Sequence, residues 1–275
     1  MKIFVTGATG FIGGHFINVV PNEIEVFAPI RSKSKPKIKL NRNVNWIHKE
    51  LDCIDSKDLK EMNAIVHFAS PGVSPQKASW KELYYWNVDC TLKLLRSAAE
   101  AGVGKVIIAG SYIEYGLSAN KYKYIPSTAA LLPTTSYASS KAAAFELAHA
   151  FCIDAKISLV YNRIFSAFGE GQYYGNFWPS LKKAAMDNKD FNMTSGEQIR
   201  DFIPVEEVAL SFLKDLKLDN GIDFTPRVKN VCSGKGISIL EFASSWWGIW
   251  NAKSKLIPGK IPSRKDEPIR FVGKL

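Results

Sequence analysis

Tyr137 and Lys141 stand four residues apart in the segment "SYASSKAAAFE", a spacing that places both side chains on one face of a helix. A neighbouring ammonium favours the ionised form of a phenol, so the pair predicts a lowered pKa for Tyr137. Such a phenol exchanges a proton with a bound molecule near neutral pH. Because Tyr-x-x-x-Lys is common by chance, its meaning depends on the residues around it.

Ser111 supplies a third polar group, directly after the apolar run "KVIIAG" at residues 105–110. That run predicts a buried strand, and ligands of parallel sheets bind beyond the carboxyl ends of the strands. We expect the Ser111 hydroxyl to donate a hydrogen bond to a carbonyl oxygen beside Tyr137. Ser111, Tyr137 and Lys141 are therefore the candidate catalytic residues.

A glycine-rich turn, "TGATGFIGG", follows the first apolar run of the chain. Gly7 permits a tight turn, and Gly10 lets the amides of Phe11 and Ile12 approach a phosphate at the start of a helix. Gly13 permits close packing of that helix on the strand. The spacing predicts a dinucleotide site, with a plain strand–turn–helix connection as the alternative.

The second apolar run ends in "RSKSK", where sites that prefer NAD place an acidic residue for the ribose 2′-hydroxyl. Arg31 stands there instead, and a basic side chain accommodates a 2′-phosphate. We therefore expect NADP(H) as the preferred cofactor, with NAD(H) possible. The alternative is that these residues form only a solvated basic loop.

Short apolar runs alternate with amphipathic stretches through the first 165 residues. This alternation predicts an α/β fold, a Rossmann-type doubly wound parallel sheet, over residues 1–165. Residues 166–275 lack this regular alternation, which predicts a smaller C-terminal substrate-binding lobe, interleaved with the end of the sheet. The expected strands are residues 2–6, 25–30, 63–69, 105–110 and 157–164, and the expected helices are residues 11–20, 80–101 and 137–151.

The composition restricts the possible partners. The 275 residues are 46% hydrophobic with a formal charge of +10, but apart from residues 31–39 the basic residues are dispersed, so no nucleic-acid partner is expected. The four cysteines are far apart, which predicts neither a metal site nor disulfides. The chain begins directly with a predicted strand and has no long apolar run, so we expect a cytoplasmic protein with no membrane span.

Taken together, these motifs resemble the extended short-chain dehydrogenases/reductases, in the branch of sugar-nucleotide epimerases, dehydratases and 4-ketoreductases. This resemblance implies a nucleotide-diphosphate sugar as substrate and a homodimer paired through helices. The matching motifs run in family order along the chain: "TGATGFIG", "VHFAS", "WNVDCT", "GSYIEYG", "YASSK", "NRIFSAFG", "GEQIRDFIPVEEVA" and "IPSRKDEP".

The same resemblance implies further binding residues. Asn176, Arg200 and Arg264 occupy positions that contact the substrate diphosphate, and guanidinium groups match phosphate oxygens. Ser166 stands where relatives often have asparagine. A structural ion pair is the alternative for Arg200. The implied cofactor contacts, besides the glycine turn and the catalytic pair, are Asp52, Cys53, Phe68, Ala69, Ser70 and Asn87.

The residues after Ser111 limit the reactions that the site could catalyse. Sugar-nucleotide 4,6-dehydratases usually read Thr-Asp-Glu where this chain has Ser111, Tyr112 and Ile113, so the acid and base for dehydration are missing. The favoured hypothesis is NADPH-dependent reduction of the C4 keto group of a nucleotide-linked 4-keto-6-deoxyhexose, in the synthesis of deoxysugars for surface polysaccharides. The alternatives are a nucleotide-sugar 4-epimerase with bound NAD, and a non-catalytic NADP-binding scaffold or sensor.

Overall fold

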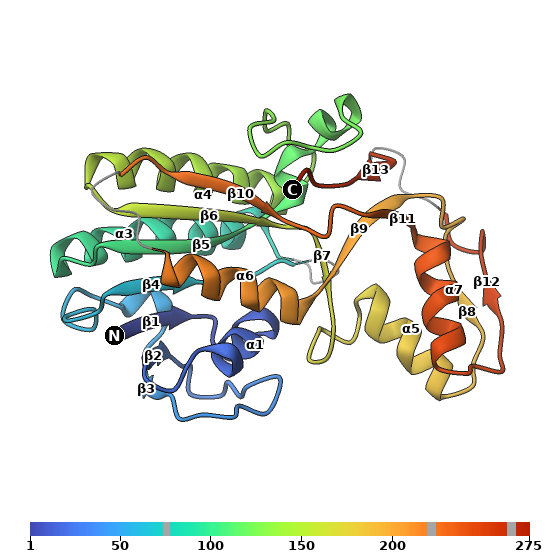
Figure 1. Ribbon diagram of the computed structural model, residues 1–275, viewed down its shortest axis with the longest axis horizontal. Helices are drawn as coiled ribbons and strands as arrows, with labels where there is room; N and C mark the ends of the chain where they lie inside the picture. The colour runs from blue at the N-terminus through green and yellow to red at the C-terminus, as the bar shows by residue number, and fades with distance from the viewer. Residues whose placement is uncertain (74–77, 219–223, 263–267) are drawn as a thin grey trace.

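A parallel sheet forms the main body of the computed structural model, which describes residues 1–73, 78–218, 224–262 and 268–275. Within these residues the sheet has seven strands in the order β10-β6-β5-β4-β1-β2-β3 (Figure 1). They are β1 (Lys2–Thr6), β2 (Glu25–Pro29), β3 (Asn45–Ile47), β4 (Ala64–His67), β5 (Lys105–Ser111), β6 (Ser158–Ile164) and β10 (Arg227–Val231).

The strand order reverses at β1, which pairs with β2 on one side and β4 on the other. Ile3 lies opposite Val26 of β2 and opposite Ala64 of β4. Because the chain winds outward in both directions from this point, ligands of such sheets are expected to bind at the carboxyl ends of β1 and β4. The architecture confirms the predicted α/β fold with a doubly wound parallel sheet.

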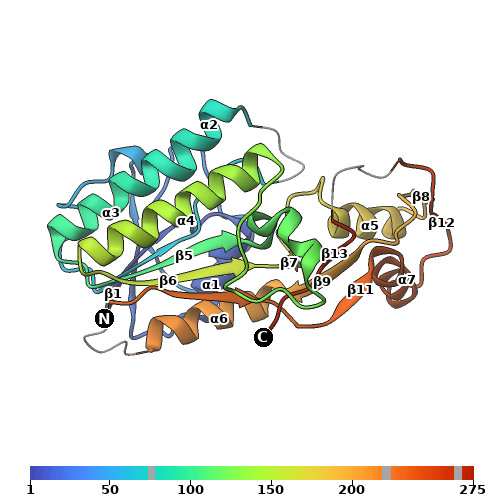
Figure 2. The ribbon, with the colours of Figure 1, turned by 90° about the horizontal axis from the view of Figure 1, so that it is seen from above.

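Helices cover both faces of the sheet (Figures 1 and 2). Ile3 and Val5 of β1 belong to the hydrophobic cluster that includes the apolar side chains of α1 and α6, while Phe4 faces the cluster under α3 and α4. In the described ranges, no helix is long and apolar enough to cross a membrane. The helices are α1 (Phe11–Val19), α2 (Trp80–Tyr84), α3 (Cys90–Ala101), α4 (Ser136–Asp154), α5 (Phe177–Met186), α6 (Val205–Lys217) and α7 (Ile239–Ile249).

The single helix expected over residues 80–101 is wrong in one respect. A π-helical turn, η2 (Tyr85–Asp89), separates α2 from α3. The Thr91 hydroxyl donates to the Asn87 carbonyl at 2.7 Å, and the Asn87 amide donates to the Ser140 hydroxyl on α4 at 2.9 Å. These side-chain bonds hold the widened turn, and such turns occur frequently at functional sites.

A smaller lobe lies at one end of the large sheet (Figure 1). Its sheet is built on β9, and both α6 and β10 return from the second half of the chain to the layers of the main body. The aromatic segment "SSWWGIW" packs inside the lobe, where Trp178 lies 5.5 Å from Trp246 and 5.7 Å from Trp250 between ring centres. The lobe strands are β7 (Ser166–Phe168), β8 (Phe191–Asn192), β9 (Ile199–Pro204), β11 (Gly236–Ser238), β12 (Leu256–Ile257) and β13 (Arg270–Phe271).

Candidate active site

The glycine turn lies between β1 and α1, beside the chain that leaves β4. Gly7 has a φ of +70°, and a Cβ on it would stand 2.7 Å from the amide nitrogen of Ala69. A Cβ on Gly13 would collide with the Gly7 carbonyl oxygen. Both positions therefore need glycine, the first for its backbone conformation and the second for the close approach of helix and strand.

The N-terminus of α1 carries backbone donors at the carboxyl end of β1. Gly10 is the N-cap residue, and its cap makes no side-chain hydrogen bond. The amides in the first turn of a helix have no partner within the helix, so those of Phe11 and Ile12 are placed to bind an anion. The turn is thus shaped as a phosphate cradle.

The segment after β4 runs alongside this cradle. The Ala69 amide donates to the Thr6 hydroxyl at 3.2 Å, which ties the segment to the end of β1. The Phe68 ring packs against Phe16 and Phe212, with centroid distances of 5.4 Å and 4.7 Å. Phe68 therefore contributes its ring to the core, and its backbone lies beside Gly7.

The basic segment after β2 folds back over the glycine turn. The Lys37 amide donates to the Thr9 carbonyl at 3.0 Å. The Arg31 side chain is exposed, and its Nε donates to the Ser34 hydroxyl at 3.2 Å. The segment that carries Arg31 thus lies between the end of β2 and the glycine turn.

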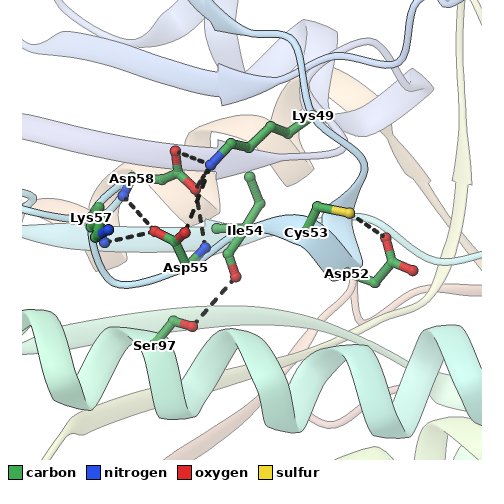
Figure 3. Close-up of polar contacts among 8 residues, drawn as sticks. All are labelled: Lys49, Asp52, Cys53, Ile54, Asp55, Lys57, Asp58 and Ser97. Atoms are coloured by element: carbon green, nitrogen blue, oxygen red, sulfur yellow. Dashed lines mark hydrogen bonds and ion pairs between the residues drawn. The ribbon is translucent and has the colours of Figure 1, made fainter.

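Asp52 and Cys53 lie in a short 3₁₀ turn, η1 (Leu51–Cys53), after β3. The Tyr85 hydroxyl donates to Asp52 at 2.6 Å, and this bond lowers the pKa of the Asp52 carboxyl. Figure 3 shows the Cys53 thiol directed to the same carboxylate, 3.6 Å from its oxygen. The Asp52 carboxylate is thus engaged by two side chains of the protein, and the adenine contact expected of Asp52 and Cys53 stays a prediction.

The neighbouring ion pair fixes the loop that follows η1. The Lys49 ammonium lies 2.7 Å from an Asp58 oxygen and 3.8 Å from an Asp55 oxygen, as Figure 3 shows. Asp55 also accepts from the Lys57 amide at 2.8 Å. These contacts stabilise the connection between β3 and β4.

The three candidate catalytic residues come from two elements that meet at the sheet edge. Ser111 ends β5, and Tyr137 and Lys141 lie in the first turns of α4. The helix starts here because the Thr135 hydroxyl caps it, accepting from the Ala138 amide at 3.2 Å. Lys141 is buried, and its ammonium donates to the Ala109 carbonyl at 2.6 Å.

The expected lowering of the Tyr137 pKa is wrong. Burial raises the pKa of this phenol to about 12, outweighing the opposite effect of a hydrogen bond with Ser70. The Lys141 ammonium is bonded to the Ala109 carbonyl, and burial lowers its own pKa while the Glu114 carboxylate raises it. Desolvation penalises the charged form of both groups, so it acts in opposite directions on the phenol and the ammonium.

A chain of hydrogen-bonded polar side chains ends at the backbone carbonyl of Tyr137. The Ser70 hydroxyl donates to the Asn87 side-chain oxygen at 2.7 Å, and the Asn87 amide donates to Ser140 at 2.9 Å. The Ser140 hydroxyl in turn donates to the Tyr137 carbonyl at 2.9 Å. Sequence reasoning missed Ser140, because nothing in "SYASSK" distinguishes this serine from its neighbours.

On the lobe side, Asn176 and Arg200 are held in different ways. Asn176 precedes α5, and its buried side-chain oxygen has no protein partner. Arg200 is buried, and its guanidinium donates to the carbonyls of Ile199 and Ile269 at 2.9 Å and 3.2 Å. Ser166 begins β7. Arg264 lies outside the described residues.

Asp201, next to Arg200, has other partners. Its carboxylate accepts from the Ser233 hydroxyl at 2.6 Å and from the amides of Ser233, Gly234 and Gly273. These bonds join β9 to the segments around it. Over the part of the chain that the structure describes, no group of three or more His, Cys, Asp or Glu side chains could hold a metal ion.

Comparison with known proteins agrees with this geometry. A family model described as "NAD dependent epimerase/dehydratase family" matches residues 3–224. The chain belongs to this family. It is thus an NAD-dependent epimerase/dehydratase-family enzyme, and the predicted resemblance to sugar-nucleotide enzymes is confirmed.

Two curated relatives of this epimerase/dehydratase-family enzyme match nearly its whole length. CDP-abequose synthase from Salmonella muenchen is 26% identical over 97% of this chain and 86% of its own. UDP-glucose 4-epimerase from Erwinia amylovora is 26% identical over 97% of this chain and 87% of its own. The solved structure of MoeE5 in complex with UDP-glucuronic acid and NAD covers all of this chain and 90% of its own, at 25% identity and a TM-score of 0.86.

Proposed function

We propose that this enzyme reduces the C4 keto group of a nucleotide-linked 4-keto-6-deoxyhexose with NADPH, in the synthesis of deoxysugars. The observation that carries the proposal is the placement of Ser111, Tyr137 and Lys141 at the end of β5 and the start of α4, where the carboxylate that follows Ser111 is paired with Arg163. Burial holds the pKa of Tyr137 at about 12, so the phenol is protonated at neutral pH and ready to donate.

The nicotinamide cofactor fits the first half of the site. The close packing of α1 on the turn at Gly13 keeps the first-turn amides of the helix at the end of β1, where they can bind a diphosphate. Arg31, exposed at the end of β2, supports NADPH over NADH because its guanidinium matches a 2′-phosphate. When bound, this cofactor supplies the hydride for reduction.

The protein's own groups handle the proton and the developing charge. Tyr137 donates its proton to the C4 oxygen as the carbonyl becomes an alkoxide, and the Ser111 hydroxyl donates a hydrogen bond to the same oxygen. Lys141 stands one helical turn beyond Tyr137, where its buried ammonium donates to the Ala109 carbonyl, and its proposed role is to orient the nicotinamide ribose. Ser140 and Asn87 hold the start of α4 in place during this exchange.

The groups around Ser111 count against dehydration. Tyr112 stacks on Phe165 with ring centres 5.3 Å apart, and Ile113 has no group that ionises. Glu114, the nearest carboxylate along the chain, is fully buried and paired with Arg163 at 2.8 Å. The site therefore lacks the acid and base that elimination of water requires.

The substrate is best sought among nucleotide-diphosphate sugars. Asn176, Arg200 and Arg264 are our candidates for contacts with the diphosphate. Similarity to a CDP-abequose synthase makes CDP-linked sugars the first to test. We further propose a homodimer through α3 and α4, which lie side by side on one outer face (Figure 2).

The test is a turnover assay with CDP-, dTDP-, UDP- and GDP-linked 4-keto-6-deoxyhexoses, each with NADPH and with NADH. We expect stoichiometric loss of the reduced-nicotinamide absorbance with at least one sugar, faster with NADPH. The 4-epimerase is the second candidate because UDP-glucose 4-epimerases match the whole chain. Interconversion of UDP-glucose and UDP-galactose without cofactor consumption, and no reduction of any keto sugar, would reject the reductase.

A further inference from the structure

Glu114 is a fully buried carboxylate three residues after the candidate catalytic Ser111. It lies in the 3₁₀ turn η3 (Tyr112–Tyr115) that follows β5. One of its oxygens accepts from the Ser111 amide at 2.7 Å and from the Tyr161 hydroxyl at 3.0 Å. Its other oxygen accepts from the Arg163 Nε at 2.8 Å.

The surroundings of Glu114 are built to hold this carboxylate. Arg163 is 1% exposed, donates to the Ser127 carbonyl at 2.9 Å, and lies over the Phe145 ring at 4.4 Å. Gly110 is also required, because a Cβ there would collide with the Tyr161 ring and approach Glu114 to 3.0 Å. Residues from β5, β6 and α4 therefore converge on one buried charge.

A buried ion pair costs much of its attraction in desolvation, so stability alone is a weak reason for Glu114 and Arg163 to be charged. The bond to the Ser111 amide gives the pair a second role. Ser111 ends β5, and its amide is fixed by a side chain three residues later rather than by the strand ladder alone. The direction of the Ser111 hydroxyl depends on that backbone.

We propose that Glu114 is a positioning residue: its carboxylate, held by Arg163, fixes the Ser111 backbone so that the Ser111 hydroxyl faces the sugar carbonyl. This inference rests on the proposed function of Ser111 in carbonyl reduction. Glu114 touches neither substrate nor cofactor in this role. A misplacement of about 1 Å at a reacting group costs up to about a hundredfold in rate, which sets the size of the expected effect.

Two double variants separate positioning from folding. Both carry Arg163→Met, which removes the cation, so neither leaves an unpaired buried charge. In the first, Glu114→Gln keeps an oxygen that accepts from the Ser111 amide. In the second, Glu114→Leu removes every acceptor at a similar volume. Thermal unfolding of the two variants shows whether both fold.

We expect kcat of the Leu variant to be about tenfold to a hundredfold below that of the Gln variant, with KM for NADPH equal in the two. We also expect faster hydrogen exchange at the Ser111 amide in the Leu variant, measured by NMR on the protein alone. Equal exchange and equal kcat in the two folded variants would overturn the inference. The exchange measurement needs no substrate, so it tests the contact of Glu114 with the Ser111 backbone separately. Faster exchange in the Leu variant with no keto sugar reduced would count against the proposed function and not against that contact.

Discussion

Burial decides the protonation chemistry of individual residues in this site. Tyr137 keeps its proton because its surroundings disfavour the phenolate, and the pKa rises to about 12. Lys141 is affected in the opposite direction, and Glu114 partly restores the preference for its charged form. The phenol of Tyr137 is therefore protonated at neutral pH, as the proposed role of proton donor requires.

Tyr137→Phe tests the proton donor. We expect kcat to fall by about 10²- to 10⁴-fold, the usual contribution of general acid catalysis, with little change in KM. Tyr84→Phe is the matched control, because Tyr84 bonds to Ser139 on the same helix at 2.9 Å. It should leave kcat near the wild-type value. Steady-state kinetics with the best keto sugar gives both values, and equal losses in the two variants would contradict the assignment.

Arg31→Ser tests the choice of cofactor. The guanidinium is expected to bind the 2′-phosphate of NADPH, so its removal should weaken NADPH binding by roughly tenfold or more and leave NADH binding unchanged. Fluorescence titration with each cofactor measures this. Lys57→Ser, in the loop after η1, is a control for the loss of one positive charge. Equal weakening of NADPH by both substitutions would show only a general electrostatic effect.

The turn between β1 and α1 packs directly against the end of β4, and the three form one contact region, called here the corner. Gly7 and Gly13 let the strand, turn and helix approach each other, and the Thr6 hydroxyl joins the corner to Ala69. Thr6 also contacts His67 at 2.6 Å, which joins it to β4. The phosphate cradle is therefore positioned by the strand ends.

Gly13→Ala tests the close packing of α1 on the turn. Its new Cβ would meet the backbone oxygen of Gly7, so the helix must shift, at a cost of about 1–3 kcal/mol in the free energy of unfolding. We expect weaker cofactor binding as well. Gly14→Ala is the matched control, because its Cβ would meet the flexible Ile38 side chain at 3.0 Å. Chemical denaturation and cofactor titration of both variants check the prediction, which fails if they behave alike.

The buried His67 side chain, at the end of β4, is expected to make the stability of the protein depend on pH. It is buried between Thr6 and Thr91, and burial lowers its pKa to about 3. In the unfolded state this histidine binds a proton below about pH 6.5, whereas in the folded state it does so only below about pH 3. The free energy of unfolding therefore falls as the pH drops from about 6.5 to about 3, by up to about 1.4 kcal/mol per pH unit. His67→Gln should flatten this dependence. Urea unfolding of both proteins from neutral to acidic pH measures it, and parallel slopes would contradict the role of His67.

Across the whole molecule, the sequence predicted what local pattern determines. The five inner apolar runs of the main sheet stood out, and the glycine turn and the Tyr137–Lys141 pair have fixed spacings. The edge strands β3 and β10 were not predicted, because one is three residues long and the other carries polar residues. The π turn at Asn87 and the pairing of Glu114 with Arg163 depend on partners distant in the chain. The two-residue strand Leu256–Ile257 is too short to give a pattern. The raised pKa of Tyr137 follows from burial, which only the assembled fold sets.

The central claim is net hydride transfer to C4 of a keto sugar. The most direct test is incubation with NADPH that carries deuterium at the transferred position, followed by mass spectrometry and NMR of the sugar product. We expect one deuterium at C4 of the reduced sugar for each NADPH consumed. Inverted stereochemistry at C4 of a hydroxyl sugar, with no label and no net consumption of NADPH, would contradict the reductase and identify an epimerase.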